Sequence, residues 1–159
     1  MEKNYGFNDY KFFTEMSELS SRHQSYDLSL GLPDFEIDPR LRYFLKESAD
    51  MISHSYESLA GSSLLIENII RFNLNRKNSL PLKYEEVNIV PCSTFGLYTS
   101  LKSILNTGDE VIVIQPSYYT YAPSIVLNGG VPVYYDLEND FKIDWEKLKR
   151  CITVKTKAI

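Results

Sequence analysis

A short polar loop at residues 91–96, PCSTFG, holds the side chains best suited to chemistry in this chain. Ser93 and Thr94 stand between a β-rich run at residues 87–90 and a stretch of helical character. Unpaired backbone N–H groups, the positive end of a helix dipole and two hydroxyls would converge there, which makes a suitable seat for a phosphate group. Serine and threonine at a helix start also act as simple N-caps, and the sequence leaves this alternative open.

A second loop, residues 115–123, reads QPSYYTYAP and contains Tyr118, Tyr119 and Tyr121. A tyrosine at the mouth of a sheet offers a flat face to an aromatic ligand, whereas ring packing within the protein is the ordinary alternative. In an open α/β sheet both loops would lie at the carboxyl ends of strands, where such folds bind their ligands.

The elements that would position these loops follow from alternating strand-like and helical segments. Residues 110–114, EVIVI, form a near-continuous apolar run, typical of a strand covered on both faces. Further strands are predicted at residues 87–90, 131–135 and from 157 onward, with helices at about 94–106, 119–128 and 144–151. This βαβαβαβ order predicts an α/β fold with a mostly parallel sheet and helices on both faces.

Helices are also predicted ahead of the sheet. Residues 9–19 carry apolar side chains at helical spacing. Asp38-Pro39 is typical of a helix N-terminus, here for a helix running to about residue 51, and residues 63–76 form another amphipathic segment. An N-terminal helical segment therefore precedes the α/β part.

Composition and charge narrow the class of protein. The net charge of −4 and a pI of about 5.2 give no reason to expect nucleic acid or an anionic membrane as partner. Cys92 and Cys151, with His23 and His54, have the spacing of neither a disulfide framework nor a zinc site. Residues 1–10 lack the apolar core of a secretion signal. We therefore predict a cytoplasmic protein without a metal.

Several segments together resemble the class I/II aminotransferases, fold type I enzymes that depend on pyridoxal 5′-phosphate (PLP). In chain order they are LSLGLPDF at residues 28–35, Tyr56 with Gly61, residues 87–97, GDEV at 108–111, PSYYTY at 116–121 and GGVPV at 129–133. Each segment is weakly specific, but the ordered set matches the family from about Asp27 to the end. The resemblance implies the first part of the PLP-dependent transferase large domain.

The resemblance also implies roles for individual residues. Ser93 and Thr94 match the positions that hold the PLP phosphate, in agreement with the argument from the helix terminus. Tyr118 matches the aromatic residue that stacks on the pyridine ring. Tyr56 matches a tyrosine that reaches the phosphate of the neighbouring subunit, so a homodimer is implied. Gly31 matches a glycine whose backbone approaches the substrate carboxylate.

The same resemblance divides the chain and sets its expected activity. Residues 1–50 match part of the small domain or arm, and residues 51–159 match the first part of the PLP-binding large domain. The lysine that binds PLP covalently is expected beyond Ile159, so no catalytic residue is assigned here. We expect the N-terminal portion of an enzyme that moves an amino group from an amino acid to a 2-oxo acid, and expect this chain alone to be inactive.

Other readings remain open on the sequence alone. Lyases and synthases of fold type I share these front motifs, and a non-catalytic remnant that binds a partner protein is a further alternative. Cys92, Phe95 and Ile66 depart from the family pattern and leave the substrate open. A nucleotide-binding domain is disfavoured, because the chain has no glycine-rich phosphate loop.

Overall fold

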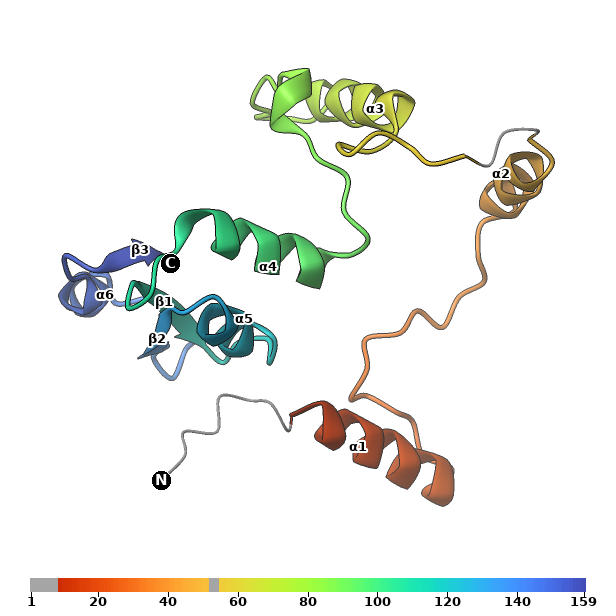
Figure 1. Ribbon diagram of the computed structural model, residues 1–159. Coiled ribbons are helices and arrows are strands. Elements are labelled where there is room, and N and C mark those ends of the chain that lie inside the picture. Colours follow the sequence, from red (N-terminus) through yellow and green to blue (C-terminus); the bar gives the residue numbers. More distant parts are fainter. Residues whose placement is uncertain (1–8, 52–54) are drawn as a thin grey trace. The chain divides into compact units, whose positions relative to one another are not determined.

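The computed structural model describes residues 9–51 and 55–159 and divides the chain into two units (Figure 1). One unit joins the described residues up to Leu30 with Cys92–Ile159, and the other is Gly31–Pro91. His54 and residues 1–8, most of the N-terminal stretch that lacks an apolar core, lie outside the described residues. The division into residues 1–50 and 51–159 stays a prediction.

A three-stranded parallel sheet lies in the first unit. β1 (Glu110–Gln115) is its middle strand, between β2 (Val131–Asp136) and β3 (Thr156–Ala158). Val111 and Ile112 of β1 are both buried. The apolar run at residues 110–114 is therefore a strand covered on both faces, as predicted.

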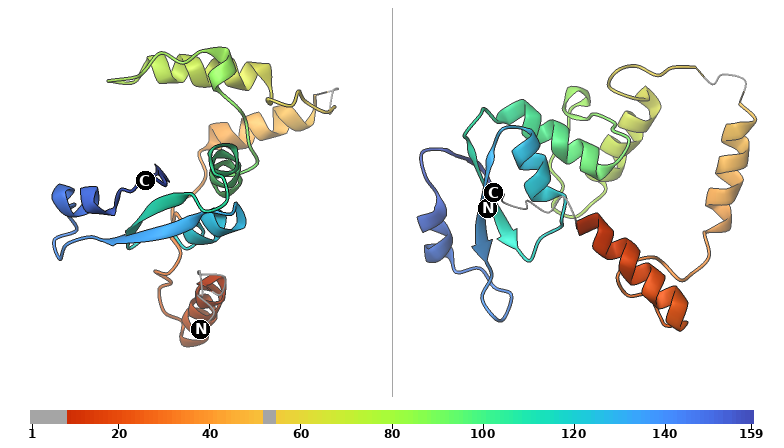
Figure 2. Two further views of the ribbon diagram at one scale, coloured as in Figure 1. Left: turned by 60° about the vertical axis from the view of Figure 1, so that its left-hand side comes forward. Right: turned by 60° about the horizontal axis from the view of Figure 1, so that its bottom comes forward.

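Helices cover both faces of this sheet, and they are α4 (Ser93–Ile104), α5 (Tyr121–Leu127) and α6 (Trp145–Cys151). Val111 and Val113 pack in one cluster with side chains of α4 and α5. Ile112 points to the opposite face, where it packs with Leu148 of α6. The right-hand view of Figure 2 shows α4 and α5 on one side of the strands and α6 on the other. The α/β fold predicted from the sequence is confirmed.

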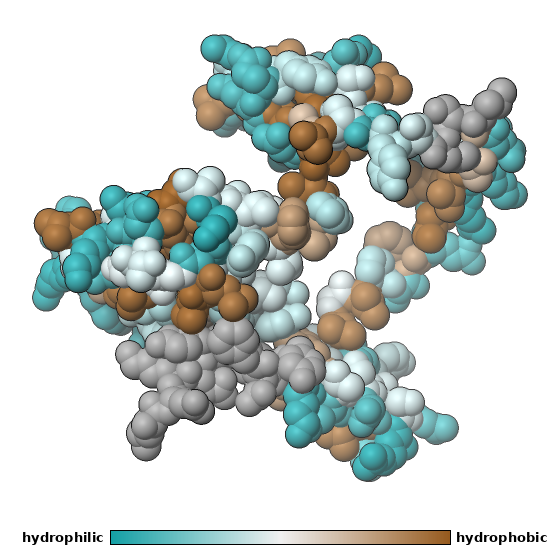
Figure 3. Space-filling model, viewed as in Figure 1, coloured by the Kyte–Doolittle hydropathy of each residue, from teal (hydrophilic) through white to brown (hydrophobic). Residues whose placement is uncertain are grey.

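The remaining helices confirm the predicted N-terminal helical segment, and they are α1 (Asp9–His23), α2 (Pro39–Ala49), α3 (Ser63–Leu74) and the 3₁₀ turn η1 (Tyr84–Glu86). Asp38 caps α2 by accepting a hydrogen bond from the Arg40 N–H, with Pro39 as the first helical residue. Ile66 of α3 is fully buried. Described residues of α2 are all exposed, and brown atoms mark its apolar side chains in Figure 3. Among the described residues, no helix combines the length and apolar character needed to cross a membrane.

The strand predicted at residues 87–90 is wrong. These residues form no ladder with any described strand and belong to the unit Gly31–Pro91. The Ile89 N–H instead donates to the carbonyl of Ala60, at 2.9 Å. A backbone donor needs one good acceptor, and here a loop carbonyl meets that need in place of a neighbouring strand.

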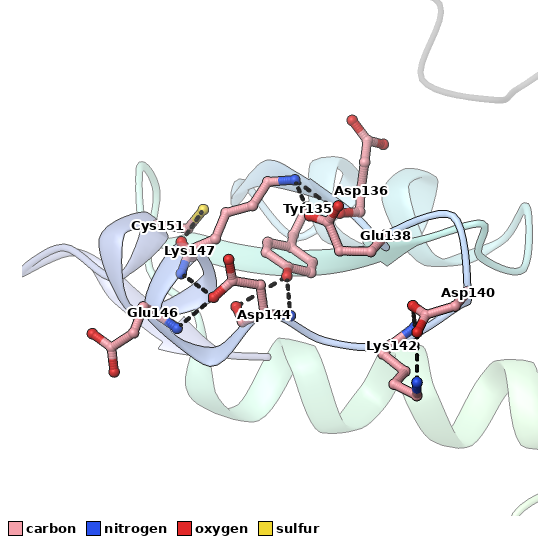
Figure 4. A network of polar contacts seen from close by, with 9 residues as sticks. All are labelled: Tyr135, Asp136, Glu138, Asp140, Lys142, Asp144, Glu146, Lys147 and Cys151. Atoms are coloured by element: carbon pink, nitrogen blue, oxygen red, sulfur yellow. Dashed lines mark hydrogen bonds and ion pairs between the residues drawn. The ribbon is translucent and has the colours of Figure 1, made fainter.

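A network of polar contacts fixes α6 against β2 (Figure 4). The Tyr135 hydroxyl, on a side chain only 1% exposed, donates to the Asp144 carbonyl at 3.0 Å and accepts from the Asp144 N–H at 2.9 Å. The Asp144 carboxylate caps α6 by accepting from the N–H groups of Glu146 and Lys147. The Lys147 ammonium bonds to Glu138, which raises the pKa of Lys147, and lies 5.4 Å from the centre of the Tyr135 ring.

We expect Tyr135→Phe to lower the free energy of unfolding by about 1–3 kcal/mol, because the backbone groups of Asp144 lose their buried partner. Denaturant unfolding of the purified protein measures this change. Tyr26→Phe is the matched control, since Tyr26 is 96% exposed and its substitution should change stability by less than about 0.5 kcal/mol. Equal effects of the two substitutions would contradict the role of the buried hydroxyl.

Candidate functional site

The first turn of α4 presents free backbone donors. Cys92 occupies the N-cap position in an extended conformation, and Ser93 and Thr94 are the first two helical residues. The first hydrogen bond within the helix runs from the Gly96 N–H to the Cys92 carbonyl, at 3.0 Å. The N–H groups of Ser93, Thr94 and Phe95 therefore have no acceptor within the helix, as at every helix N-terminus.

The two hydroxyls of this turn are also free. Ser93 and Thr94 are exposed, and neither side chain has a hydrogen-bond partner among the described residues. Thr99, one turn later, behaves differently: its hydroxyl bonds back to the carbonyl of Phe95 at 2.9 Å. The N-cap alternative does not describe Ser93 and Thr94, because Cys92 holds the cap position and makes no side-chain capping bond. Donors and hydroxyls thus remain together at a helix N-terminus, which suits an anion.

The loop after β1 presents a cluster of aromatic rings. The Tyr118 ring centre lies 4.6 Å from that of Tyr119 and 6.0 Å from that of Tyr121. Tyr119 in turn packs on Phe13 of α1, with ring centres 5.2 Å apart. Tyr118 keeps half of its surface exposed, so part of this ring is available to a ligand. A hydrogen bond with the Tyr119 side chain is the main reason that the pKa of Tyr118 is raised.

A tight turn keeps Tyr118 out of the helix that follows. The Tyr121 N–H donates to the Tyr118 carbonyl at 3.1 Å, and α5 begins only at Tyr121. The helix was predicted from about residue 119, so its start differs by two residues. This turn leaves Tyr118 in the loop, at the carboxyl end of β1.

Topology brings the α4 terminus and the tyrosine loop to the same edge of the sheet. Figure 1 shows α4 running opposite to β1, so the first turn of α4 lies at the carboxyl end of that strand. The loop that carries Tyr118 leaves β1 at the same end. Ser93, Thr94 and Tyr118 therefore belong to one edge of one unit. Nothing in the sequence pattern singles out Asn128, the C-cap residue of α5, whose side chain joins α5 to the middle of α4.

Gly31 and Tyr56 belong to the other unit. A Cβ added at Gly31 would meet no atom within 4 Å, so the backbone there is open to a ligand. Tyr56 is fully exposed. Gly61 has a φ of +103°, and an added Cβ would collide with the Ile89 side chain, so this position requires glycine. Gly61, the glycine that follows Tyr56 in the motif, therefore lets the backbone at residue 61 lie directly against Ile89.

Comparison with protein families matches this chain to one family model. The model for aminotransferase class I and II matches residues 24–159. A methionine aminotransferase of Escherichia coli is 30% identical over 148 residues, which cover 92% of this chain and 38% of that protein. An aspartate aminotransferase of Bacillus sp. is 36% identical over 134 residues, 83% of this chain and 34% of that protein. The chain thus spans little more than a third of the length of the curated relatives it matches.

Solved structures give the same result for the fold. A crystal structure of an Escherichia coli protein with methionine aminotransferase function superposes with a TM-score of 0.84 at 30% identity, covering 91% of this chain and 38% of that one. The N-succinyldiaminopimelate aminotransferase of Mycobacterium tuberculosis superposes with a TM-score of 0.83 at 26% identity, with the same coverage of both chains. Most of the chain, both units included, therefore has its counterpart within larger structures.

We expect Ser93→Ala to weaken the binding of inorganic phosphate by about 10-fold, because a hydrogen bond to a charged group contributes roughly 1.5–3 kcal/mol. Calorimetric titration of the full-length protein with phosphate measures the change. Ser100→Ala is the matched control, since Ser100 is also exposed on α4 but lies beyond its first turn. If both variants bind phosphate as the unmodified protein does, the anion seat does not lie at the start of α4.

Proposed function

The chain belongs to the class I and II aminotransferase family, and from this premise we propose that its full-length protein transfers the amino group of an amino acid to a 2-oxo acid through PLP. The observation that carries the proposal is the start of α4, where the Ser93 and Thr94 hydroxyls and free N–H groups stand on the same edge as the Tyr118 loop. The exchange is redox-neutral, because the amino acid becomes a 2-oxo acid as the other 2-oxo acid becomes an amino acid.

The residues of this edge fit the parts of PLP. Ser93 and Thr94, with the N–H groups of the first turn, would hold the phosphate dianion, for which a helix N-terminus is well suited. The half-exposed ring of Tyr118 would lie against the pyridine ring. When bound, PLP supplies an electron-poor ring that stabilises negative charge on the amino acid. In this proposal Ser93, Thr94 and Tyr118 bind and orient the cofactor, and none of them is assigned a proton transfer.

Two residues of the other unit complete the proposal. Gly31 is assigned to the substrate carboxylate, because its open backbone leaves room for a ligand to approach. Tyr56 is assigned to the phosphate in a second subunit, and its fully exposed side chain is free to reach across a dimer interface. The active form in this proposal is a homodimer, with part of each cofactor site supplied by the partner copy.

The substrates are proposed as an amino acid and a 2-oxo acid, and the compartment as the cytoplasm. Methionine and aspartate aminotransferases both match the chain, so their names do not select one amino acid for this protein. We assign the protein to the cytoplasm, since both Cys92 and Cys151 are free thiols, which suits a reducing compartment. The negative net charge favours small molecules over nucleic acid or anionic membrane as ligands.

The full-length protein should bind PLP, with a visible absorbance band, and should convert an amino acid and a 2-oxo acid into the exchanged pair. Absence of a bound cofactor, or cofactor binding without amino transfer to any 2-oxo acid, would contradict the proposal. A lyase or synthase would bind PLP and consume the amino acid without needing a 2-oxo acid, so omitting the 2-oxo acid separates these activities.

We expect Tyr118→Ala to weaken PLP binding by about 10-fold, because a stacked aromatic pair contributes up to about 1.5 kcal/mol. Tyr118→Phe keeps the ring face and should change the dissociation constant by less than about 3-fold. Fluorescence titration with PLP measures both variants, and Tyr26→Ala, at an exposed position far from the loop in sequence, is the control. Equal losses for the alanine and phenylalanine variants would assign the contribution to the hydroxyl instead.

A further inference from the structure

Asn128 joins the two helices whose N-termini reach the candidate site. It is the C-cap residue of α5 and is only 6% exposed. Its amide nitrogen donates to the Tyr98 carbonyl of α4 at 3.1 Å and to the Ser124 carbonyl of its own helix at 2.9 Å. The amide oxygen is buried without a hydrogen-bond partner among the described residues, so the two bonds of the amide nitrogen are what hold this side chain in place.

The rest of the contact between α4 and α5 is apolar. Leu101 and Leu105 pack with Ile125 and the valines of β1. Apolar contacts are not directional and tolerate a slide of one helix along the other. A hydrogen bond weakens steeply when distance or angle changes. The Asn128 bond is a directional contact between the two helices themselves, and a backbone bond from the Gly108 N–H to the Gly129 carbonyl, at 2.8 Å, joins the segments that follow them. Together the two bonds specify how far α5 extends relative to α4.

The bond is rigidly connected to the site along both helices. Tyr98 is five residues after Ser93, which corresponds to about 7.5 Å along a helix axis, and Asn128 is seven residues after Tyr121, about 10.5 Å. Both helices run antiparallel to β1, so their first turns point to the same edge. A shift at Asn128 would therefore move the Tyr118 loop relative to Ser93.

We propose that Asn128 is a positioning residue: it fixes the spacing between the anion seat at Ser93 and Thr94 and the aromatic face of Tyr118. The inference rests on the proposed function, because it concerns a ligand that carries a phosphate and a ring in one rigid molecule. Such a ligand gains from both seats only when their spacing matches its own, and a misplacement of about 1 Å is costly. A ligand that uses one seat alone is insensitive to the spacing.

The test compares ligands that use one seat or both. In the full-length protein, Asn128→Leu replaces the amide with an apolar side chain of similar size, and we expect it to raise the PLP dissociation constant about 10-fold. The dissociation constants of pyridoxal and of inorganic phosphate should each change by less than about 2-fold. Asn75→Leu is the matched control, because Asn75 is the C-cap residue of α3 but is exposed.

A second variant covers the case in which Asn128→Leu fails to fold. Asn128→Ser keeps a polar side chain that can still bond to the Ser124 carbonyl of its own helix but is too short to reach the Tyr98 carbonyl of α4. The same selective loss of PLP affinity is therefore expected. A lower melting temperature with an unchanged PLP dissociation constant would show a structural role only and overturn the inference. Equal losses for PLP, pyridoxal and phosphate would also overturn it. If the unmodified protein binds no PLP, the proposed function itself fails, a result distinct from a failure of the Asn128 variants alone.

Discussion

Burial of β1 on both faces is the constraint on which the first unit depends. Val111 and Val113 face α4 and α5, while Ile112 faces α6, so the strand is stable only with a helix layer on each side. Because parallel strands need helical crossovers, α5, which connects β1 to β2, begins at the carboxyl end of β1. α4 runs antiparallel to β1, so its first turn lies at the same end (Figure 1). The position of the candidate site thus follows from the helices that cover the central strand. Ser93, Thr94 and Tyr118 are placed there by these helices while their own side chains stay exposed.

The first turn of α4 can bind an anion because its hydrogen-bond donors have no partner within the described residues. Cys92 takes the cap position without a side-chain bond, and Ser93 and Thr94 keep their hydroxyls free. A capping side chain at the N-cap would stabilise the helix by about 1 kcal/mol, and Cys92 makes no such bond, so the exposed donors of the first turn are available to an anion. The geometry of this turn suits an anion, and the motif resemblance implies the same two residues for a phosphate, so we keep Ser93 and Thr94 as the proposed seat.

Elements set by local signals could be predicted from the sequence, and long-range contacts could not. The apolar run of β1 and the Asp38-Pro39 helix start are local, and both were predicted correctly. Residues 87–90 have the same local character as a strand, but the Ile89 N–H bonds to a loop carbonyl nearly thirty residues earlier, so the prediction failed. The Asn128 contact with Tyr98 also spans 30 residues and has no local pattern that would reveal it. The placement of Ser93, Thr94 and Tyr118 near helix starts was predictable because loop–helix junctions leave local signals, whereas their roles toward a ligand stay a prediction.

We propose that a single edge of the sheet holds both ends of PLP. A crystal structure of the full-length protein grown with PLP tests it most directly, through the position of the phosphorus atom in the electron density. We expect a phosphate within hydrogen-bonding distance of the Ser93 and Thr94 hydroxyls and the N–H groups of the first turn of α4, with the pyridine ring against Tyr118. A phosphate bound elsewhere, with the first turn of α4 left to solvent, would contradict it.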